Sequence, residues 1–127
     1  MITIAVAVVV SRGQVLVGRR AAGAVDAAGL DEFPGGKVEA GESPEDAAAR
    51  ECVEESGVAV RIDSLLDRAP GVAATGPIDI LFFAATPLDH RAEPLVPFAW
   101  VPLAELASRV FPPANAGVLA RLVQGGS

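Results

Sequence analysis

Acidic side chains crowd the stretch from residue 36 to residue 58, in a chain in which only 20% of the residues are charged. The stretch contains Glu39, Glu42, Glu45, Asp46, Glu51, Glu54 and Glu55. Carboxylates this close together repel one another, and a hard divalent cation removes that repulsion while it also binds substrate phosphates. The stretch therefore indicates metal-assisted chemistry at a phosphate, with a solvated acidic helix face as the structural alternative.

The same stretch contains the signals that begin and end a helix. Ser43 is a favoured N-cap, Pro44 suits the first helical position, and Asp46 follows the cap by three residues. Gly57 is a favoured terminator at the other end. The sequence therefore predicts a helix over residues 44–56.

Three glutamates of this helix share one face. At about 100° per residue, Glu51, Glu54 and Glu55 stand at positions i, i+3 and i+4. Like charges at these spacings repel, so the helix gains no stability from them unless a cation is present. The residues expected to point the other way, into a core, are Ala49, Cys52 and Val53.

The spacing of the charged residues and glycines resembles the Nudix box. That motif is G-x5-E-x7-R-E-U-x-E-E-x-G-U, in which U is a bulky apolar residue, and the chain fits it at every fixed position. The fixed positions are occupied by Gly36, Glu42, Arg50, Glu51, Glu54, Glu55 and Gly57. Cys52 is a slightly unusual small hydrophobe at the first U position, and Val58 takes the second. On this motif the chain is identified as a member of the Nudix family.

Two further stretches resemble MutT-type pyrophosphohydrolases within that family. One is the run EFPGGKVE at residues 32–39, which leads into the box, and the other is FPPAN at residues 111–115. The resemblance implies a Nudix-type α/β/α sandwich with a mixed β-sheet, in which the box forms a loop-helix-loop. It also implies hydrolysis of a nucleoside triphosphate, above all 8-oxo-dGTP or a related purine deoxynucleotide, to the monophosphate and pyrophosphate.

The resemblance implies roles for the residues of the box. A metal ion, Mg²⁺ or Mn²⁺, is expected to bind to carboxylates and to a backbone carbonyl, from Glu51, Glu54, Glu55 and either Gly35 or Gly36. The expected catalytic residues are Glu54, Glu51 and Arg50. Arg50 is expected mainly to orient the glutamates, and Glu42 to be structural.

Substrate contacts are expected from Arg20, Phe33, Lys37 and Asn115. The Asn115 amide has a donor and an acceptor that can match one purine edge, and Phe33 could present its backbone to the same base. Lys37 could meet a phosphate. Each charged or polar residue also has a plainer interpretation, which is a solvated or ion-paired charge for Arg20 and Lys37 and a helix N-cap for Asn115.

One position departs from the resemblance. MutT-type enzymes carry a glutamate just before a tryptophan, where it helps to bind metal or to activate water, and here Ala99 precedes Trp100. The identity of the general base is therefore open. The side chains that could reach in from loops to replace it are Glu93, Glu105, Asp89 and His90. Trp100 is expected in the core, with stacking on the substrate as the alternative.

Hydrophobic periodicity predicts strands that alternate with two further helices. The expected strands are residues 3–10, 14–19, 58–66, 78–85 and 95–101, and the expected helices are residues 102–110 and 114–124. Loops are expected at residues 21–30, 70–77 and 86–94. No repeat or linker divides the sequence, so we expect one domain over residues 1–127.

Length and charge limit the classes of partner. The chain has 127 residues, 51% of them hydrophobic, a net charge of −6 and a pI near 4.6. Such a protein is not attracted to a nucleic-acid polymer or to an anionic membrane, although a small anionic substrate could still bind if metal ions supply positive charge. The resemblance implies that this partner is a nucleoside triphosphate. The apolar start is too short to span a membrane, and one cysteine forms no internal disulfide, which predicts a cytoplasmic protein. We expect a monomer or a homodimer.

The resemblance leaves the nucleotide open. Alternatives with the same chemistry are dCTP, another nucleoside triphosphate or ADP-ribose. A third alternative is a nucleotide sensor that no longer cleaves its ligand, which the complete box argues against and Ala99 argues for.

Overall fold

The computed structural model describes residues 1–20 and 29–125, so most of the loop expected at residues 21–30 lies outside the described residues. The strands are β1 (Ile2–Ser11), β2 (Gln14–Arg19), β3 (Asp31–Glu32), β4 (Gly35–Lys37), β5 (Val60–Ala73), β6 (Gly76–Pro87) and β7 (Ala99–Pro102). The helices are α1 (Pro44–Ser56), the two 3₁₀ helices η1 (Leu103–Ser108) and η2 (Pro113–Asn115), and α2 (Ala116–Gly125). This order of strands and helices is typical of the α/β class.

Strand β1 is buried on both faces along its centre, as the apolar run at residues 4–10 predicts. Alternate side chains of a strand point to opposite faces of the sheet. Ala5, Ala7 and Val9 join the core cluster that includes residues of α1. Val6 and Val8 join the cluster on the other side, which includes residues of η1 and α2. The sheet is therefore covered by helices on both faces.

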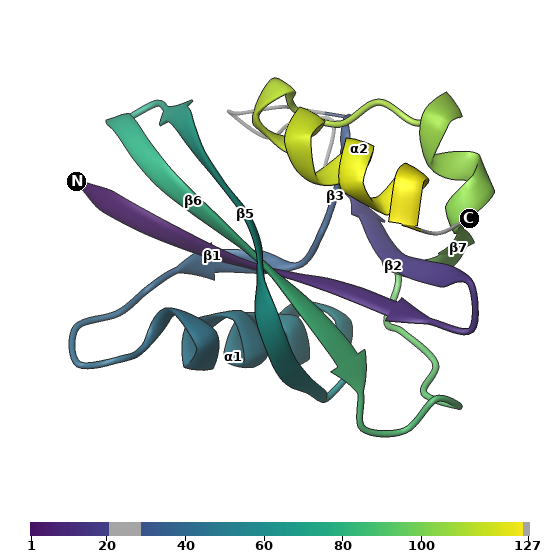
Figure 1. Cartoon of the computed structure of the whole chain (residues 1–127). Helices are drawn as coiled ribbons and strands as arrows, with labels where there is room; N and C mark the ends of the chain where they lie inside the picture. The colour runs from purple at the N-terminus through teal and green to yellow at the C-terminus, as the bar shows by residue number, and fades with distance from the viewer. Residues whose placement is uncertain (21–28, 126–127) are drawn as a thin grey trace.

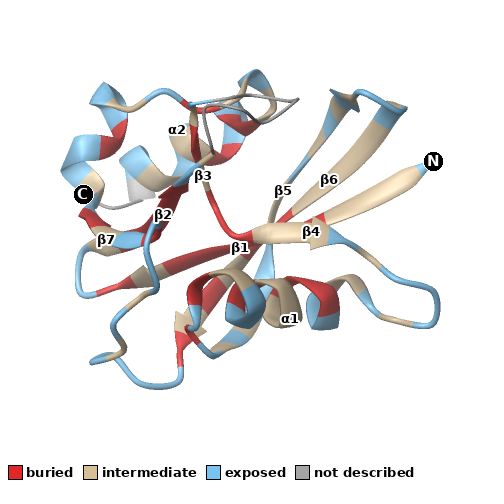
Figure 2. Cartoon of the chain, turned by 180° about the vertical axis from the view of Figure 1, so that it is seen from behind, coloured by how far each residue is buried: buried red, intermediate tan, exposed pale blue. Residues whose placement is uncertain are grey.

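The sheet is mixed, with the strand order β3-β2-β1-β6-β5, and β4 pairs with β1 while β7 pairs with β2. Strands β1 and β6 are parallel, and the other pairs are antiparallel. Figure 1 shows α1 on one side of the strands and α2 on the other. Figure 2 shows, from behind, that the buried stretches of β1 and β2 lie between these two layers. The α/β/α sandwich expected from the sequence is confirmed.

Helix α1 begins and ends where the sequence predicts. The Ser43 hydroxyl accepts a hydrogen bond from the backbone N–H of Asp46 at 3.1 Å. Gly57 follows the helix with a φ of 75°, a left-handed conformation that favours glycine. The local chemistry of the two ends was sufficient to predict the whole helix.

The expectation that Ala49 and Val53 lie in the core is wrong, because Ala49 is only half-buried and outside both core clusters, and Val53 is 46% exposed. The buried residues of α1 are Ala47, Ala48, Cys52 and Ser56. Three of these are four residues apart and form a stripe along the helix, and Val53 falls outside it. The polar Ser56 takes the last core position instead, and its hydroxyl donates to the carbonyl of Cys52 at 2.6 Å.

The prediction of a loop at residues 70–77 is also wrong. Strands β5 and β6 continue through it as a long hairpin, in which Pro70 pairs with Asp79 and Val72 with Pro77. Strand β5 lies at the edge of the sheet, where a proline is tolerated because its missing N–H need not face a neighbouring strand. Pro77 lies in β6 just before the pairing with β1 starts at Ile78. The position of a strand in the sheet can therefore accommodate prolines that, judged from the local sequence alone, would argue against a strand.

The C-terminal elements are shorter than the sequence predicts. The strand expected at residues 95–101 begins only at Ala99, after two prolines at 94 and 97 that lack backbone donors. The helix expected at 102–110 is the 3₁₀ helix η1, and the one expected at 114–124 is divided into η2 and α2. Among the residues described, no helix has the length and apolar character needed to cross a membrane.

Candidate active site

Arg50 contacts the carboxylates of the acidic stretch from the exposed face of α1. Its guanidinium donates to Glu42 at 2.7 and 3.0 Å, to Glu51 at 2.8 Å and to Glu54 at 3.2 Å. It also donates to the backbone carbonyl of Lys37 at 3.1 Å. These hydrogen bonds raise the pKa of Arg50 and lower the pKa of Glu42. Arg50 thus joins helix α1 to the preceding loop and holds two of the three glutamates that are expected to bind the metal.

Two glycines let β4 approach α1 and β1 closely. A Cβ atom on Gly36 would lie 2.5 Å from the carboxyl carbon of Glu51, and a Cβ atom on Gly35 would lie 2.6 Å from the carbonyl oxygen of Ala5. Any side chain at either position would push these groups apart. The glycine pair therefore places a stretch of backbone directly beside the glutamates.

Glu55 is held against the same backbone. One of its carboxylate oxygens accepts a hydrogen bond from the N–H of Gly35 at 2.8 Å. The pKa of Glu55 is raised to about 7, mainly by burial; the nearby charges of Glu32 and Glu51 contribute to this rise, and the Gly35 hydrogen bond opposes it. The folded protein without a cation therefore disfavours the charged form of this carboxyl.

The oxygen atoms of these residues are the type of ligand that a hard divalent cation prefers. The glutamates and the backbone beside them offer only oxygen ligands, and a cation there would relieve the repulsion among Glu32, Glu51 and Glu55. Within residues 1–20 and 29–125, however, no three acidic, histidine or cysteine side chains already converge as a metal site. Glu51 and Glu54 instead contact Arg50, and Glu55 contacts Gly35.

We expect the metal-free protein to lose stability as the pH rises from about 4.5 to about 7. The folded pKa of Glu55 lies above its usual 4.5, so its contribution is complete below that value and is lost as the pH rises through about 7. Thermal unfolding with a chelator present, followed in the wild type and in Glu55→Gln, measures this. Glutamine cannot ionise, so the wild-type Tm should fall relative to the variant. Parallel profiles for the two proteins would contradict the assignment.

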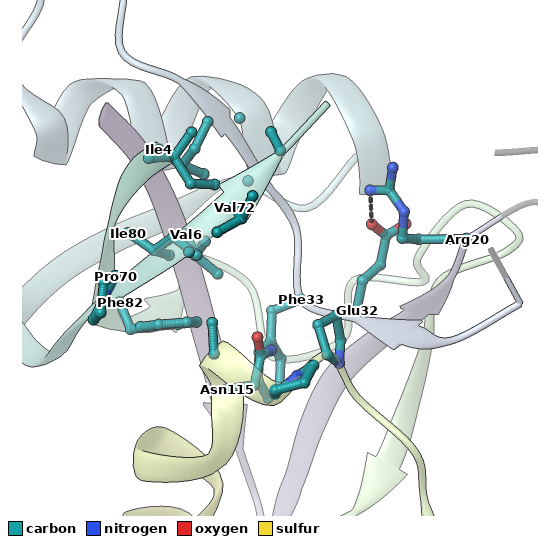
Figure 3. Close-up of a pocket in the computed structure, with 18 residues that line it drawn as sticks. Ile4, Val6, Arg20, Glu32, Phe33, Pro70, Val72, Ile80, Phe82 and Asn115 are labelled. Carbon is teal, nitrogen blue, oxygen red and sulfur yellow. Dashed lines mark hydrogen bonds and ion pairs between the residues drawn. The ribbon is translucent and has the colours of Figure 1, made fainter. Parts of the chain in front are cut away.

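A cavity of about 620 Å³ begins beside the glycine pair. Arg20, Glu32, Gly35 and Gly36 form its polar part, next to the hydrogen bond between Gly35 and Glu55. Most of the remaining wall is apolar and comes from β1, β5 and β6, including Ile4, Val6, Pro70, Val72, Ile78, Ile80 and Phe82. Figure 3 shows Arg20 and Glu32 on one side of the view and the aliphatic residues on the other. The cavity therefore has one charged region and one apolar region.

Three of the four residues expected to bind substrate line this cavity, namely Arg20, Phe33 and Asn115. Phe33 is buried and its ring stacks on Phe111 at a centroid distance of 4.8 Å. The fourth residue, Lys37, is exposed on β4 and does not line the cavity. Its backbone carbonyl, rather than its ammonium group, takes part in the site, through Arg50.

Asn115 is buried, with 8% of its surface exposed, and it lies at the end of η2. Asn115 lines the cavity, as Phe33 does, and both are labelled in Figure 3. Within the described part of the chain its amide makes no hydrogen bond, so it does not cap α2 through its side chain. No side-chain N or O atom among the described residues is both fully buried and without a partner, so the Asn115 amide keeps some accessible surface and can bind a ligand in the cavity.

Glu32 is a charged residue of the cavity wall that was not predicted as a site residue. Its side chain is 24% exposed and forms an ion pair with Arg20 at 3.3 Å. Burial raises the pKa of Glu32, and Arg20 partly opposes that shift. The only sequence signal was its place beside Phe33 in the EFPGGKVE run, because the pairing of β3 with β2, which brings Glu32 to Arg20, is a tertiary feature.

Four residues were considered as a replacement general base, namely Glu93, Glu105, Asp89 and His90. None of them lines the cavity. His90 instead shares a hydrogen bond of 2.5 Å with the Ser11 hydroxyl, at the far end of β1. Ala99 is exposed on β7 opposite Val17 and is also absent from the cavity wall. Trp100 packs against the core cluster, as expected, and its Nε1 donates to the Ala92 carbonyl at 3.0 Å.

Comparison with known proteins supports one family. Residues 1–122 match the NUDIX domain. The 8-oxo-dGTP diphosphatase of Escherichia coli (strain K12) is 37% identical over 113 residues, which are 86% of this chain and 85% of that protein. The 8-oxo-dGTP diphosphatase of Haemophilus influenzae is 36% identical over 115 residues, covering 87% of this chain and 82% of that protein.

A solved structure supports the fold. The MutT protein from Methanosarcina mazei Go1 superposes with a TM-score of 0.82 at 21% sequence identity, over 99% of this chain and 95% of that one. Nudix hydrolases generally use divalent metal ions, which agrees with the oxygen ligands gathered around Gly35 and Gly36. The family match over residues 1–122, the two relatives and the complete box lead to one conclusion: the chain belongs to the Nudix family and is a Nudix hydrolase.

Proposed function

We propose that this protein hydrolyses a purine deoxynucleoside triphosphate, 8-oxo-dGTP foremost, to the nucleoside monophosphate and pyrophosphate. The names of its two relatives support this substrate. The observation that carries the proposal is the cavity, in which the unpaired Asn115 amide lies among apolar walls while the glycine pair and its glutamates border the polar region. A purine fits between apolar walls, and its polyphosphate would extend toward the carboxylates.

The metal would bind in this acidic region. Mg²⁺, or Mn²⁺ in its place, would be held by Glu51, Glu54, Glu55 and a backbone carbonyl of Gly35 or Gly36. When bound, such an ion neutralises phosphate charge and lowers the pKa of a water ligand. Arg50 keeps Glu51 and Glu54 on one side of the site through its hydrogen bonds. Arg20, held by Glu32, faces the cavity where a phosphate or sugar would pass.

Residues 1–127 would form one catalytic domain that works in the cytoplasm, where the nucleotide pool is found. The extent of the family match supports the first part. The buried, unpaired Cys52 supports the second, because a reducing compartment requires no disulfide. Burial raises the pKa of its thiol to about 11, so it does not act as a nucleophile.

A phosphate-release assay over a nucleotide panel tests the substrate. The purified chain is incubated with Mg²⁺ and inorganic pyrophosphatase, and 8-oxo-dGTP, dGTP, dATP, dCTP and ADP-ribose are compared by kcat/KM. We expect 8-oxo-dGTP to be the best substrate. A preference for dCTP or ADP-ribose would replace the purine assignment, and binding without cleavage of any nucleotide would indicate a sensor.

Asn115→Ala is expected to lower kcat/KM for 8-oxo-dGTP by about 10-fold, because a buried base edge loses a matched partner. The loss for dCTP should be much smaller, since a pyrimidine does not present the same edge. The ratio of the two kcat/KM values is the measurement, with the Tm recorded for each protein. An equal loss on both nucleotides would mean that Asn115 does not read the base.

A further inference from the structure

Strand β5 contains a bulge on the side of the sheet that faces α2. Leu65 pairs with Phe83 and Asp67 pairs with Phe82, so Leu66 is an extra residue in the register. A bulge of this kind turns the neighbouring side chains away from strict alternation. Leu66 packs against the core cluster beneath α2, and Asp67 lies on the same face as its partner Phe82, a member of that cluster. Two successive residues of β5 therefore face the α2 layer.

Asp67 reaches the first turn of α2. Gly117 is the second residue of that helix, and a Cβ atom placed on it would collide with Oδ2 of Asp67. The carboxylate thus fills the space that a side chain at this position would need. Within the described residues the Asp67 side chain forms no hydrogen bond or ion pair, and it stands at the positive end of the helix dipole.

The first turn of α2 also determines where Asn115 points. Asn115 lies two residues before Gly117, in η2, which continues directly into α2. Its backbone N–H donates to the carbonyl of Pro112 at 3.0 Å, whereas its side-chain amide has no partner among the described residues. The direction of the amide therefore depends on the backbone, and the backbone depends on how α2 sits on β5.

We propose that Asp67 is a positioning residue for base recognition, which holds the first turn of α2 through its contact with Gly117 and so directs the Asn115 amide into the cavity. This inference rests on the proposed function, in which Asn115 reads the base. Gly117 belongs to the same arrangement, because only a residue without a Cβ atom lets the carboxylate approach so closely.

A double-mutant cycle between the two residues tests the proposal. The readout is the ratio of kcat/KM for 8-oxo-dGTP to that for dCTP, together with the Tm. Gly117→Ala should lower the ratio by about 10-fold and lower the Tm, because the new methyl group displaces the helix from Asp67. Asp67→Ala alone should lower the ratio by about threefold, through loss of the charge at the helix end.

The double variant distinguishes the proposed contact from a general loss of stability by the sign of the change in Tm. Alanine is normally better than glycine in a helix. With the carboxylate removed, Gly117→Ala should therefore raise the Tm above that of Asp67→Ala and should not lower the ratio further. Asp63→Ala is the matched control, since it removes the same charge from the exposed part of β5, and it should leave the ratio unchanged.

The outcomes separate the positioning role from the proposed function. A Gly117→Ala protein that gains stability and keeps its ratio would overturn the proposal. If Gly117→Ala alone does not fold, failure of Asp67→Ala to rescue it would overturn the proposal as well. When Asn115→Ala lowers the ratio but neither Asp67→Ala nor Gly117→Ala does, only the positioning role is wrong. When Asn115→Ala also leaves the ratio unchanged, the base-reading function itself is wrong.

Discussion

Glu55→Gln is expected to lower kcat for the preferred nucleotide by at least about 100-fold while the protein still folds. Glutamine keeps an oxygen that can accept the N–H of Gly35, so the contact between α1 and β4 can survive. A neutral amide is nevertheless a poor ligand for Mg²⁺. Glu54→Gln should have an effect of the same order, because it also removes an expected metal ligand. Glu54 is 57% exposed, and Arg50 is its one partner among residues 1–20 and 29–125.

Steady-state kinetics over a range of Mg²⁺ concentrations measures this effect, with circular dichroism as the test of folding. Glu45→Gln provides the matched control, since Glu45 is an exposed glutamate in the first turn of the same helix and lies away from the glycine pair. It should keep wild-type turnover. If Glu54→Gln and Glu55→Gln both kept wild-type turnover as well, the metal would have to bind elsewhere.

Arg50→Ala is expected to lower kcat/KM by about 10- to 100-fold, the range found when residues that orient metal ligands are removed. The guanidinium contacts Glu42, Glu51 and Glu54, and its loss leaves these carboxylates to repel one another. It also frees the carbonyl of Lys37, so the loop before α1 loses its link to the helix. The Tm should therefore fall together with the activity.

Arg50→Lys distinguishes geometry from charge. Lysine keeps the positive charge but cannot donate to Glu42 through two nitrogens while it also reaches Glu51. We expect it to recover part of the Tm and little of the activity. Arg61→Ala is the control, because Arg61 forms an exposed ion pair with Asp63 on β5, and it should change neither quantity. Full activity in Arg50→Lys would show that charge alone is sufficient.

Local chemistry explains why the bounds of helix α1 could be predicted from the sequence. Ser43, Pro44 and Gly57 define its ends through contacts within a few residues, and those contacts form wherever the segment lies. The spacing of the glutamates then follows from helix geometry alone. For the same reason the two faces of β1 could be predicted from its uninterrupted apolar residues.

Other features required the tertiary structure, because they depend on which strands become neighbours. Prolines at 70 and 77 argue locally for a loop, and only the position of β5 at the sheet edge makes a long hairpin acceptable there. Val53 is apolar, but its exposure depends on where the stripe of α1 meets the sheet.

The site shows the same division. By itself, the sequence determined the type of chemistry, because seven residues of the box and their spacing place oxygen ligands and an arginine on one helix face. The tertiary structure alone decided that Glu32 meets Arg20, that Lys37 stays outside the cavity, and that Asp67 reaches the helix after Asn115. These contacts join residues far apart in the chain or depend on a bulge in β5. Their formation depends on strand register and layer packing, which no local pattern of residue types specifies.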